Sequence, residues 1–235
     1  MDGSLDSPDQ GARKSHAGFE PIVFIVSAPS GAGKSTLVNA VIDSMAGLRR
    51  VVTCTTRQPR TDEADGVAYH FLERDEFDRR LAQGDFIEWN EIYGQRYGTS
   101  RRVFEAALEE ARRCGDDLVL VIDVDGKENF TAAYGEAVSI FVMPPSIDEL
   151  RSRIAERGTE APEAAAKRLA RAQTELSRAN GYRHATDQIR EILLATQALW
   201  DLSAETEDEA DRRRAQRGAF RLVHLASVLA VTTAA

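Results

Sequence analysis

The sequence predicts an α/β protein built on a parallel sheet, and three observations support this fold class. A continuous apolar run at residues 21–26 leads into a glycine-rich turn and then into apolar residues at helical spacing. Two later apolar runs, at residues 117–122 and 137–143, alternate with helical stretches. Hydrophobic residues at 43% and charged residues at 29% are ordinary for a folded globular chain.

The elements of this core can be placed in order from their patterns. Residues 21–26 read as a strand buried on both faces, because the run shows no polar alternation. The first helix follows the turn, and its apolar face comprises Leu37, Val38, Val41, Ile42 and Met45. Further helices are expected at residues 101–113, 127–134, 147–156 and 163–178.

Three segments fall outside this alternation. Residues 53–100 contain strand-like stretches at 67–71 and 86–93 and predict an insertion with its own small sheet. Residues 157–165 are charged and contain Gly158 and Pro162, which favours a mobile lid. The N-terminal residues 1–20 read as a flexible tail.

Composition limits the partners of the chain. A formal net charge of −8 and a pI near 5.2 argue against nucleic acid as the main partner. Cys54 and Cys114 lack the spacing of a disulfide framework or a zinc site and suit a reducing cytoplasm. The N-terminus has no apolar core of a signal peptide, and residues 222–231 are too short to span a membrane, so no membrane association is expected.

A phosphate-binding loop follows the first strand. The segment reads Ala28-Pro29-Ser30-Gly31-Ala32-Gly33-Lys34-Ser35, a Walker A sequence with Ala in place of its first Gly. Backbone N–H groups around Gly31 and Gly33 and the start of the next helix suit phosphate oxygens. We therefore expect an ATP site at Ser30, Gly31, Ala32, Gly33, Lys34, Ser35 and Thr36. Lys34 would reach the β- and γ-phosphates and Ser35 would ligate Mg²⁺. The alternative is a glycine-rich turn that only joins strand to helix.

Two arginines on a proline-containing loop predict a second phosphate site. Arg57 and Arg60 lie three residues apart, and a guanidinium group can bind phosphate oxygens with two parallel hydrogen bonds. Solvated loop arginines are the competing interpretation of this stretch. Asp123 ends an apolar run, at the edge of the sheet where ligands of open α/β sheets bind.

Several motifs in a fixed order resemble the guanylate kinase family between Pro21 and about Tyr182. Beyond the phosphate loop, they are Thr55-Thr56-Arg57-Gln58-Pro59-Arg60, Asp65-Gly66-Val67-Ala68-Tyr69-His70-Phe71, Phe86-Ile87-Glu88-Trp89, Tyr97-Gly98-Thr99-Ser100, Ile122-Asp123-Val124, Pro144-Pro145-Ser146 and Arg157-Gly158-Thr159. The resemblance implies a P-loop nucleoside-monophosphate-kinase fold with a core at residues 21–52 and 101–156, a GMP-binding insertion at 53–100 and a lid at about 157–165. It also implies ATP-dependent phosphorylation of GMP, and of dGMP, with Mg²⁺ accompanying ATP, by a monomer or homodimer.

The resemblance also implies roles for individual residues. The GMP-binding residues would be Thr53, Arg57, Arg60, Tyr69, Glu88, Tyr97, Thr99 and Asp123, and the catalytic residues Lys34, Arg153, Arg157 and Arg168. A carboxylate at Glu88 can accept from guanine N1–H and from its amino group together, which adenine cannot match. The arginines would stabilise charge in a loose phosphoryl-transfer transition state.

The chain also departs from the family pattern. Val121 stands where an acidic residue is usual, and Asp125 stands where Gln is usual. After Tyr182 the usual apolar strand and Asn-Asp are missing. Residues 183–235 predict a divergent, partly helical segment, with a helix near 189–200 and with the last strand either supplied by 220–231 or absent. Three alternatives stay open: a catalytically impaired nucleotide-binding domain, a protein-interaction module of the same fold, and a kinase for another nucleoside monophosphate.

Overall fold

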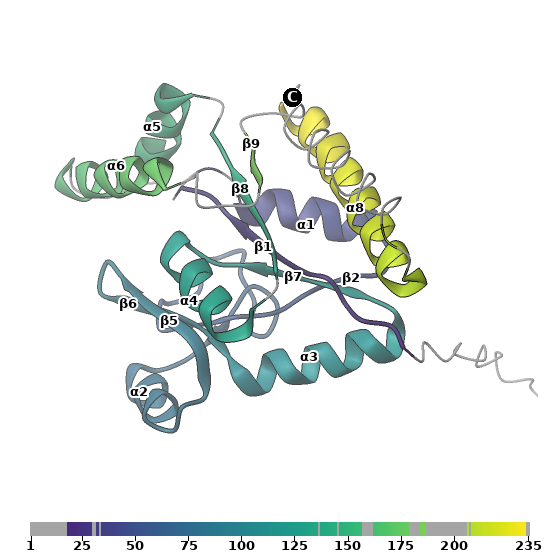
Figure 1. The fold of residues 1–235 in the computed structure, drawn as a ribbon. Helices are drawn as coiled ribbons and strands as arrows, with labels where there is room; N and C mark the ends of the chain where they lie inside the picture. Colours follow the sequence, from purple (N-terminus) through teal and green to yellow (C-terminus); the bar gives the residue numbers. More distant parts are fainter. Residues whose placement is uncertain are drawn as a thin grey trace, which may run out of the picture.

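Two β-sheets and their surrounding helices make up the part of the chain that the structure describes (Figure 1). This computed structural model describes residues 18–29, 32, 34–135, 137–144, 146–156, 162–178, 184–186, 206 and 208–233. The α/β class is confirmed, with a parallel sheet flanked by helices. Most of the expected tail, the expected helix near 189–200 and most of the proposed lid lie outside the described residues.

The central sheet is parallel and has the strand order β2-β7-β1-β8-β9. Its strands are β1 (Val23–Ser27), β2 (Leu48–Arg50), β7 (Asp117–Val121), β8 (Val138–Val142) and β9 (His184–Thr186). The two apolar runs at 117–122 and 137–143 thus lie on either side of β1, in register from Val23 against Leu118 and from Phe24 against Val138. Continuous apolar sequence suits these strands because helices cover both faces of the sheet.

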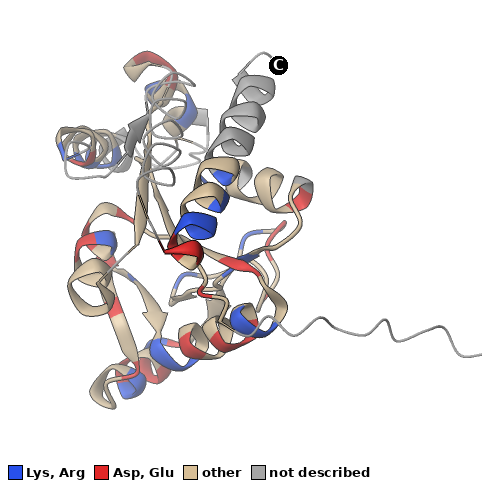
Figure 2. Ribbon diagram, turned by 45° about the vertical axis from the view of Figure 1, so that its right-hand side comes forward, with Lys and Arg blue, Asp and Glu red and all other residues tan. Residues whose placement is uncertain are grey.

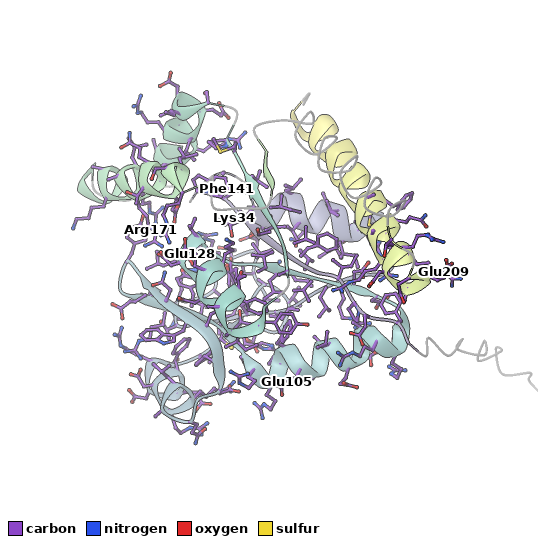
Figure 3. The ribbon with its side chains drawn as sticks, in the orientation of Figure 1. Lys34, Glu105, Glu128, Phe141, Arg171 and Glu209 are labelled. Carbon is purple, nitrogen blue, oxygen red and sulfur yellow. The ribbon has the colours of Figure 1, made fainter. Side chains whose placement is uncertain are left out.

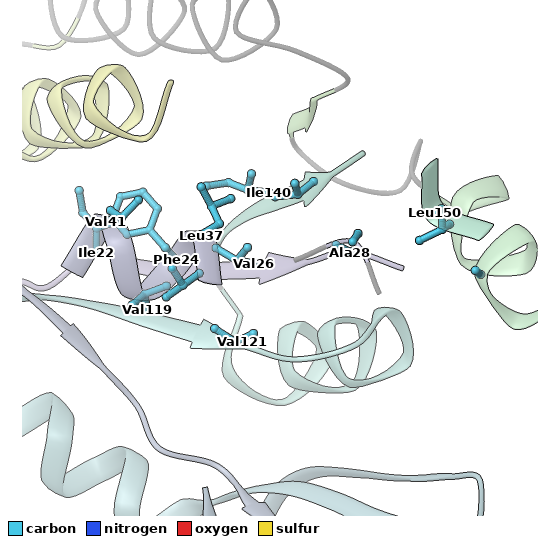
Figure 4. Close-up of a cluster of buried hydrophobic side chains, with 14 of the residues drawn as sticks. Ile22, Phe24, Val26, Ala28, Leu37, Val41, Val119, Val121, Ile140 and Leu150 are labelled. Carbon is cyan, nitrogen blue, oxygen red and sulfur yellow. The ribbon is translucent and has the colours of Figure 1, made fainter. Parts of the chain in front are cut away.

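Alternate residues of β1 belong to two cores. Phe24 and Val26 pack with the apolar residues of α1 (Lys34–Ser44) on one face, as Figure 4 shows. Val23 and Ile25 pack on the other face with residues of α3 (Arg101–Cys114) and α4 (Val124–Tyr134). The side-chain period of two along a strand produces this division.

The predicted insertion forms a second sheet with the order β4-β3-β6-β5. Its strands are β3 (Cys54–Thr55), β4 (His70–Phe71), β5 (Phe86–Ile92) and β6 (Gln95–Ser100), and α2 (Arg74–Ala82) joins β4 to β5. Two expected strands are shorter than predicted. The N–H groups of Val67 and Ala68 bond back to Ala64 in a turn, and Tyr93 adopts a positive φ of 52° in the β5–β6 hairpin.

The C-terminal part corrects the prediction for the last strand. Residues 184–186 form β9, which pairs with β8 at the edge of the central sheet, and residues 220–231 belong instead to α8 (Glu209–Thr233). No apolar run marks β9 in the sequence, because the place of this strand depends on backbone pairing with β8 rather than on a side-chain pattern. The remaining helices are α5 (Ile147–Glu156) and α6 (Pro162–Ser177).

Arginines in the first half of α8, coloured blue in Figure 2, attach this helix to the core. Arg221 donates to the carbonyls of Ala46 and Gly47 and to Asp117, a carboxylate with no exposed surface. Asp117 also accepts from the backbone N–H of Ile22 at 2.9 Å. Among the described residues, no helix has both the length and the apolar content that a transmembrane segment needs.

Candidate active site

One cavity of about 1230 Å³ lies between the carboxyl edge of the central sheet, the second sheet and α6. Strand β7 leads to it through Ile122 and Asp123, at the edge predicted for a ligand site. Its walls bring together many of the residues selected from sequence: Lys34, Ser35, Thr53, Arg57, Arg60, Tyr69, Glu88, Tyr97, Asp123 and Arg168. Of the other selected residues, Ala32, Thr99 and Arg153 are described but do not line the cavity.

The phosphate loop begins this cavity at the N-terminus of α1. Helix α1 starts at Lys34, so its first backbone N–H groups and its positive dipole end lie at the cavity beside Ser35. The Lys34 ammonium donates to the carbonyls of Ala28 and Pro29. Ser30, Gly31 and Gly33 lie outside the described residues, as does the side chain of Thr36. The described part of the loop therefore presents an ammonium, a hydroxyl and a helix terminus to an anion.

Glu88 is a buried carboxylate on the opposite wall. Its side chain is on β5, and the residue is only 5% exposed. The hydroxyl of Thr99, on the paired strand β6, donates to Glu88 Oε1 at 2.6 Å. Burial raises the pKa of Glu88 to about 7, the nearby charge of Asp123 adds to this increase, and the bond from Thr99 opposes it. A carboxyl with one oxygen engaged by Thr99 still has acceptor capacity for a ligand donor.

The two loop arginines surround a carboxylate. Arg57 Nη2 donates to both oxygens of Glu63 at 2.8 Å, and the Arg60 backbone N–H donates to Oε2 of the same group at 2.9 Å. Although burial favours the neutral acid, these bonds hold the pKa of Glu63 below its usual range. The Arg57 guanidinium also lies 5.6 Å from the ring centre of Tyr69. This part of the cavity is suited to a doubly charged phosphate.

Asp123 lies in the cavity wall at the start of α4, close to Glu88. It caps α4, since its Oδ1 accepts from the N–H of Gly126 at 2.7 Å. A Cβ built on Gly126 would lie 2.8 Å from Glu88 Oε2 and 2.9 Å from Asp123 Oδ1, so only glycine lets these carboxylates approach the helix start so closely. Val121, where an acidic residue is usual, is buried against the core.

The three arginines expected to be catalytic have different surroundings. Arg168 lines the cavity and lies 5.9 Å from the ring centre of Tyr93. Arg153 instead donates to Glu149 one turn earlier on α5 at 2.8 Å, with a side chain that is 40% exposed. Arg157 lies outside the described residues. Of the two arginines described, one lines the cavity and the other is directed elsewhere.

Several polar residues of the cavity wall were missed from sequence: Arg50, Asn90, Arg171 and Glu175. Burial raises the pKa of Glu175, against the lowering effect of the Lys34 and Arg171 charges. Arg171 is three residues after Arg168 on α6, and Asn90 is two residues after Glu88 on β5 (Figure 3 labels Arg171 and Lys34). These spacings put each on the same face as a selected residue, and this was the available signal.

Comparisons with known proteins agree with the resemblance. The guanylate kinase family model matches residues 20–199, beyond the end at Tyr182 assigned from motifs. The guanylate kinase of Symbiobacterium thermophilum is 47% identical over 151 residues, which cover 64% of this chain and 70% of that protein. The guanylate kinase of Polaromonas sp. is 39% identical over 207 residues, covering 86% and 97%. The crystal structure of guanylate kinase from Anaplasma phagocytophilum has a TM-score of 0.58 at 28% identity and covers 86% of this chain and 85% of that one.

Proposed function

The chain belongs to the guanylate kinase family and is an ATP:GMP phosphotransferase, and we propose that the transfer takes place in the cavity between Lys34 and Glu88. The observation that carries this assignment is that one cavity is lined by a phosphate-loop lysine, by paired arginines and by a buried carboxylate. These are the groups needed for a triphosphate, for an acceptor phosphate and for guanine.

In this proposal, guanine donates its N1–H and amino group to Glu88, while Thr99 holds the carboxyl from behind and Thr53 lies beside it. The phosphate of GMP is bound by Arg57, Arg60, Tyr69 and Tyr97. Because Glu63 occupies the Arg57 guanidinium here, the GMP phosphate must share or take over these donors. AMP presents an acceptor at N1 and would leave the buried carboxyl unpaired, which costs binding free energy.

On the donor side, Lys34, the loop residues 30–36 and the start of α1 bind the phosphates of ATP. Mg²⁺ fits this site, since the Ser35 hydroxyl lines the cavity and a magnesium ion usually takes one or two protein oxygens with phosphate oxygens and water. When bound, it would neutralise charge on the phosphates. Lys34, Arg168, Arg157 and Arg153 supply the remaining positive charge as the γ-phosphoryl group passes to GMP.

The direct test is ADP formation from ATP and Mg²⁺ with GMP, dGMP, AMP, CMP, UMP or dTMP offered in parallel. We expect release with GMP and dGMP only, and its loss in Lys34→Ala. Folded protein that releases no ADP with any acceptor would overturn the proposal. Release with AMP equal to that with GMP would contradict the role of Glu88.

A further inference from the structure

Three donors from three different elements hold the Asp123 carboxylate. Gly126 of α4 donates its backbone N–H to Oδ1, as described above. The other oxygen, Oδ2, accepts from Asn90 Nδ2 of β5 and from Arg171 Nη2 of α6, each at 2.9 Å. The Asp123 side chain is only 13% exposed. Both rotatable bonds of the side chain are thereby fixed, and the second sheet and α6 contribute directly to its orientation.

The Arg171 guanidinium also links this carboxylate to Glu175, whose charge interacts with that of Lys34 in the phosphate loop. Its Nε donates to Glu175 Oε1 at 2.9 Å, and its Nη2 reaches Asp125 Oδ2 at 3.3 Å as well as Asp123. Asn90 likewise reaches Asp125 Oδ2, at 3.1 Å. The unusual Asp125 therefore lies in the same arrangement, as a second anchor for Asn90 and Arg171.

We propose that Arg171 and Asn90 are positioning residues for the acceptor, which fix the carboxylate of Asp123 from α6 and from the second sheet so that GMP meets it in one orientation. This inference rests on the proposed function, in which Asp123 faces GMP. If the inference holds, GMP binding depends on the packing of α6 against α4, although neither Arg171 nor Asn90 needs to contact GMP.

A matched control lies seven residues further along the chain. Arg178 also bridges to α4, through Asp125 Oδ1 and Glu128 Oε2, but it makes no described contact with Asp123 (Figure 3 labels Glu128). Arg171→Met and Arg178→Met therefore remove similar ion pairs between α6 and α4, and only the first releases Asp123. If docking of α6 were the whole role of these arginines, the two variants would behave alike.

The experiment measures kcat and KM for GMP and for ATP in wild type, Arg171→Met, Arg178→Met and Asn90→Ala, with GMP binding in the absence of ATP followed by calorimetry. We expect Arg171→Met and Asn90→Ala to raise the KM and Kd for GMP about tenfold, with the KM for ATP within about twofold. Arg178→Met is expected to stay within about twofold of wild type for both substrates, and Arg171→Lys to recover part of the loss.

The same substitutions in an Asp123→Asn background separate positioning from general damage. If Arg171 acts through Asp123, then Arg171→Met should change the GMP constants less than about twofold in that background. Equal effects of Arg171→Met and Arg178→Met, or an undiminished effect in Asp123→Asn, would overturn the inference. Failure of the proposed function is a separate result, since it would appear as a wild-type protein that does not phosphorylate GMP.

Discussion

At the scale of single residues, the burial of Glu88 links stability to pH. Its pKa is raised from 4.5 to about 7 in the folded protein, so the folded state binds this proton more tightly than the unfolded chain. Protonation of Glu88 makes its full contribution to the free energy of unfolding below pH 4.5, and this contribution is lost as the pH rises through 7. Above pH 7 the ionised group costs about 3 kcal/mol.

Replacing Glu88 by Gln should remove this cost. We expect Glu88→Gln to increase the free energy of unfolding by about 2–3 kcal/mol at pH 8 and by little at pH 5, in urea titrations at both pH values. Glu91→Gln is the control, because Glu91 is on the same strand with a side chain that is 45% exposed. Stabilisation by Glu88→Gln that is equal at both pH values would contradict the raised pKa.

The same ionisation should control recognition of the acceptor. The ionised carboxylate can accept both hydrogen bonds from guanine, whereas the protonated acid carries a proton that competes with these donors. With a pKa of about 7, the ionised fraction of Glu88 falls about tenfold between pH 8 and pH 6, so the KM for GMP should rise about tenfold over this range. Steady-state kinetics of wild type and Glu88→Gln across this range are the measurement. The GMP constant of the variant should be high and vary less with pH. Identical pH profiles in the two proteins would exclude Glu88 as the titrating group.

Gly126 offers a test of the close approach between the two carboxylates. Gly126→Ala introduces a Cβ within 3 Å of Glu88 and Asp123, yet alanine is favoured by about 1 kcal/mol within a helix. We therefore expect thermal stability close to that of wild type, together with at least tenfold weaker GMP binding measured by calorimetry. Unchanged GMP affinity in a folded variant would show that the two carboxylates can separate without loss.

The sequence predicts those site residues that lie within short sequence motifs. It does not predict residues whose role depends on contacts with residues far along the chain. Glu88 and Thr99 belong to short motifs and form the hydrogen-bonded pair on adjacent strands. Asn90 and Arg171 meet Asp123 across 33 and 48 residues of chain. Their spacing from Glu88 and Arg168 places them on the same face as a selected residue, but it does not show that they contact Asp123. Their contribution depends on how α6 and β5 pack around α4, which the order of residues does not show.

At the scale of elements, buried strands and amphipathic helices were predictable, because apolar periodicity reports burial directly. The strands around β1 and the helices α1, α3 and α6 followed this rule. The edge strand β9 and the helix α8 did not, since one depends on backbone pairing with β8 and the other on arginine contacts at the base of the core.

Helix α8 makes the anchoring role of Arg221 testable. Arg221→Met would remove the α8 hydrogen-bond donor of the fully buried Asp117 and leave this carboxylate with the Ile22 N–H and the Arg217 guanidinium at 3.8 Å. We expect the free energy of unfolding to fall by about 2 kcal/mol. Arg213→Met is the matched control, because Arg213 pairs with Glu209 on the same helix at an exposed position and such pairs contribute about 0–1 kcal/mol. Urea unfolding of both variants is the measurement. Equal losses would argue that α8 is held by something other than Arg221.

At the scale of the whole molecule, the cavity separates the proposed GMP-binding wall, with Glu88 and Arg57, from the proposed ATP-binding wall at Lys34 and Ser35. Arg153 is paired with Glu149 outside this cavity. Phosphoryl transfer in water-excluded surroundings needs these walls and the arginines of α5 and α6 to come together. In the proposed mechanism, Arg153 exchanges Glu149 for the phosphates, and the energy for this exchange comes from contacts that both nucleotides make in the closed form.

Closure should therefore require both substrates. Small-angle scattering with a non-hydrolysable ATP analogue and GMP together is expected to show a smaller radius of gyration than with either ligand alone. Arg168→Met should weaken this compaction, because Arg168 is the one of the two described catalytic candidates on α5 and α6 that lines the cavity. Scattering curves that stay superimposable with both ligands at saturation would mean that the walls meet the substrates without closing, and that Arg153 has no part in the transfer.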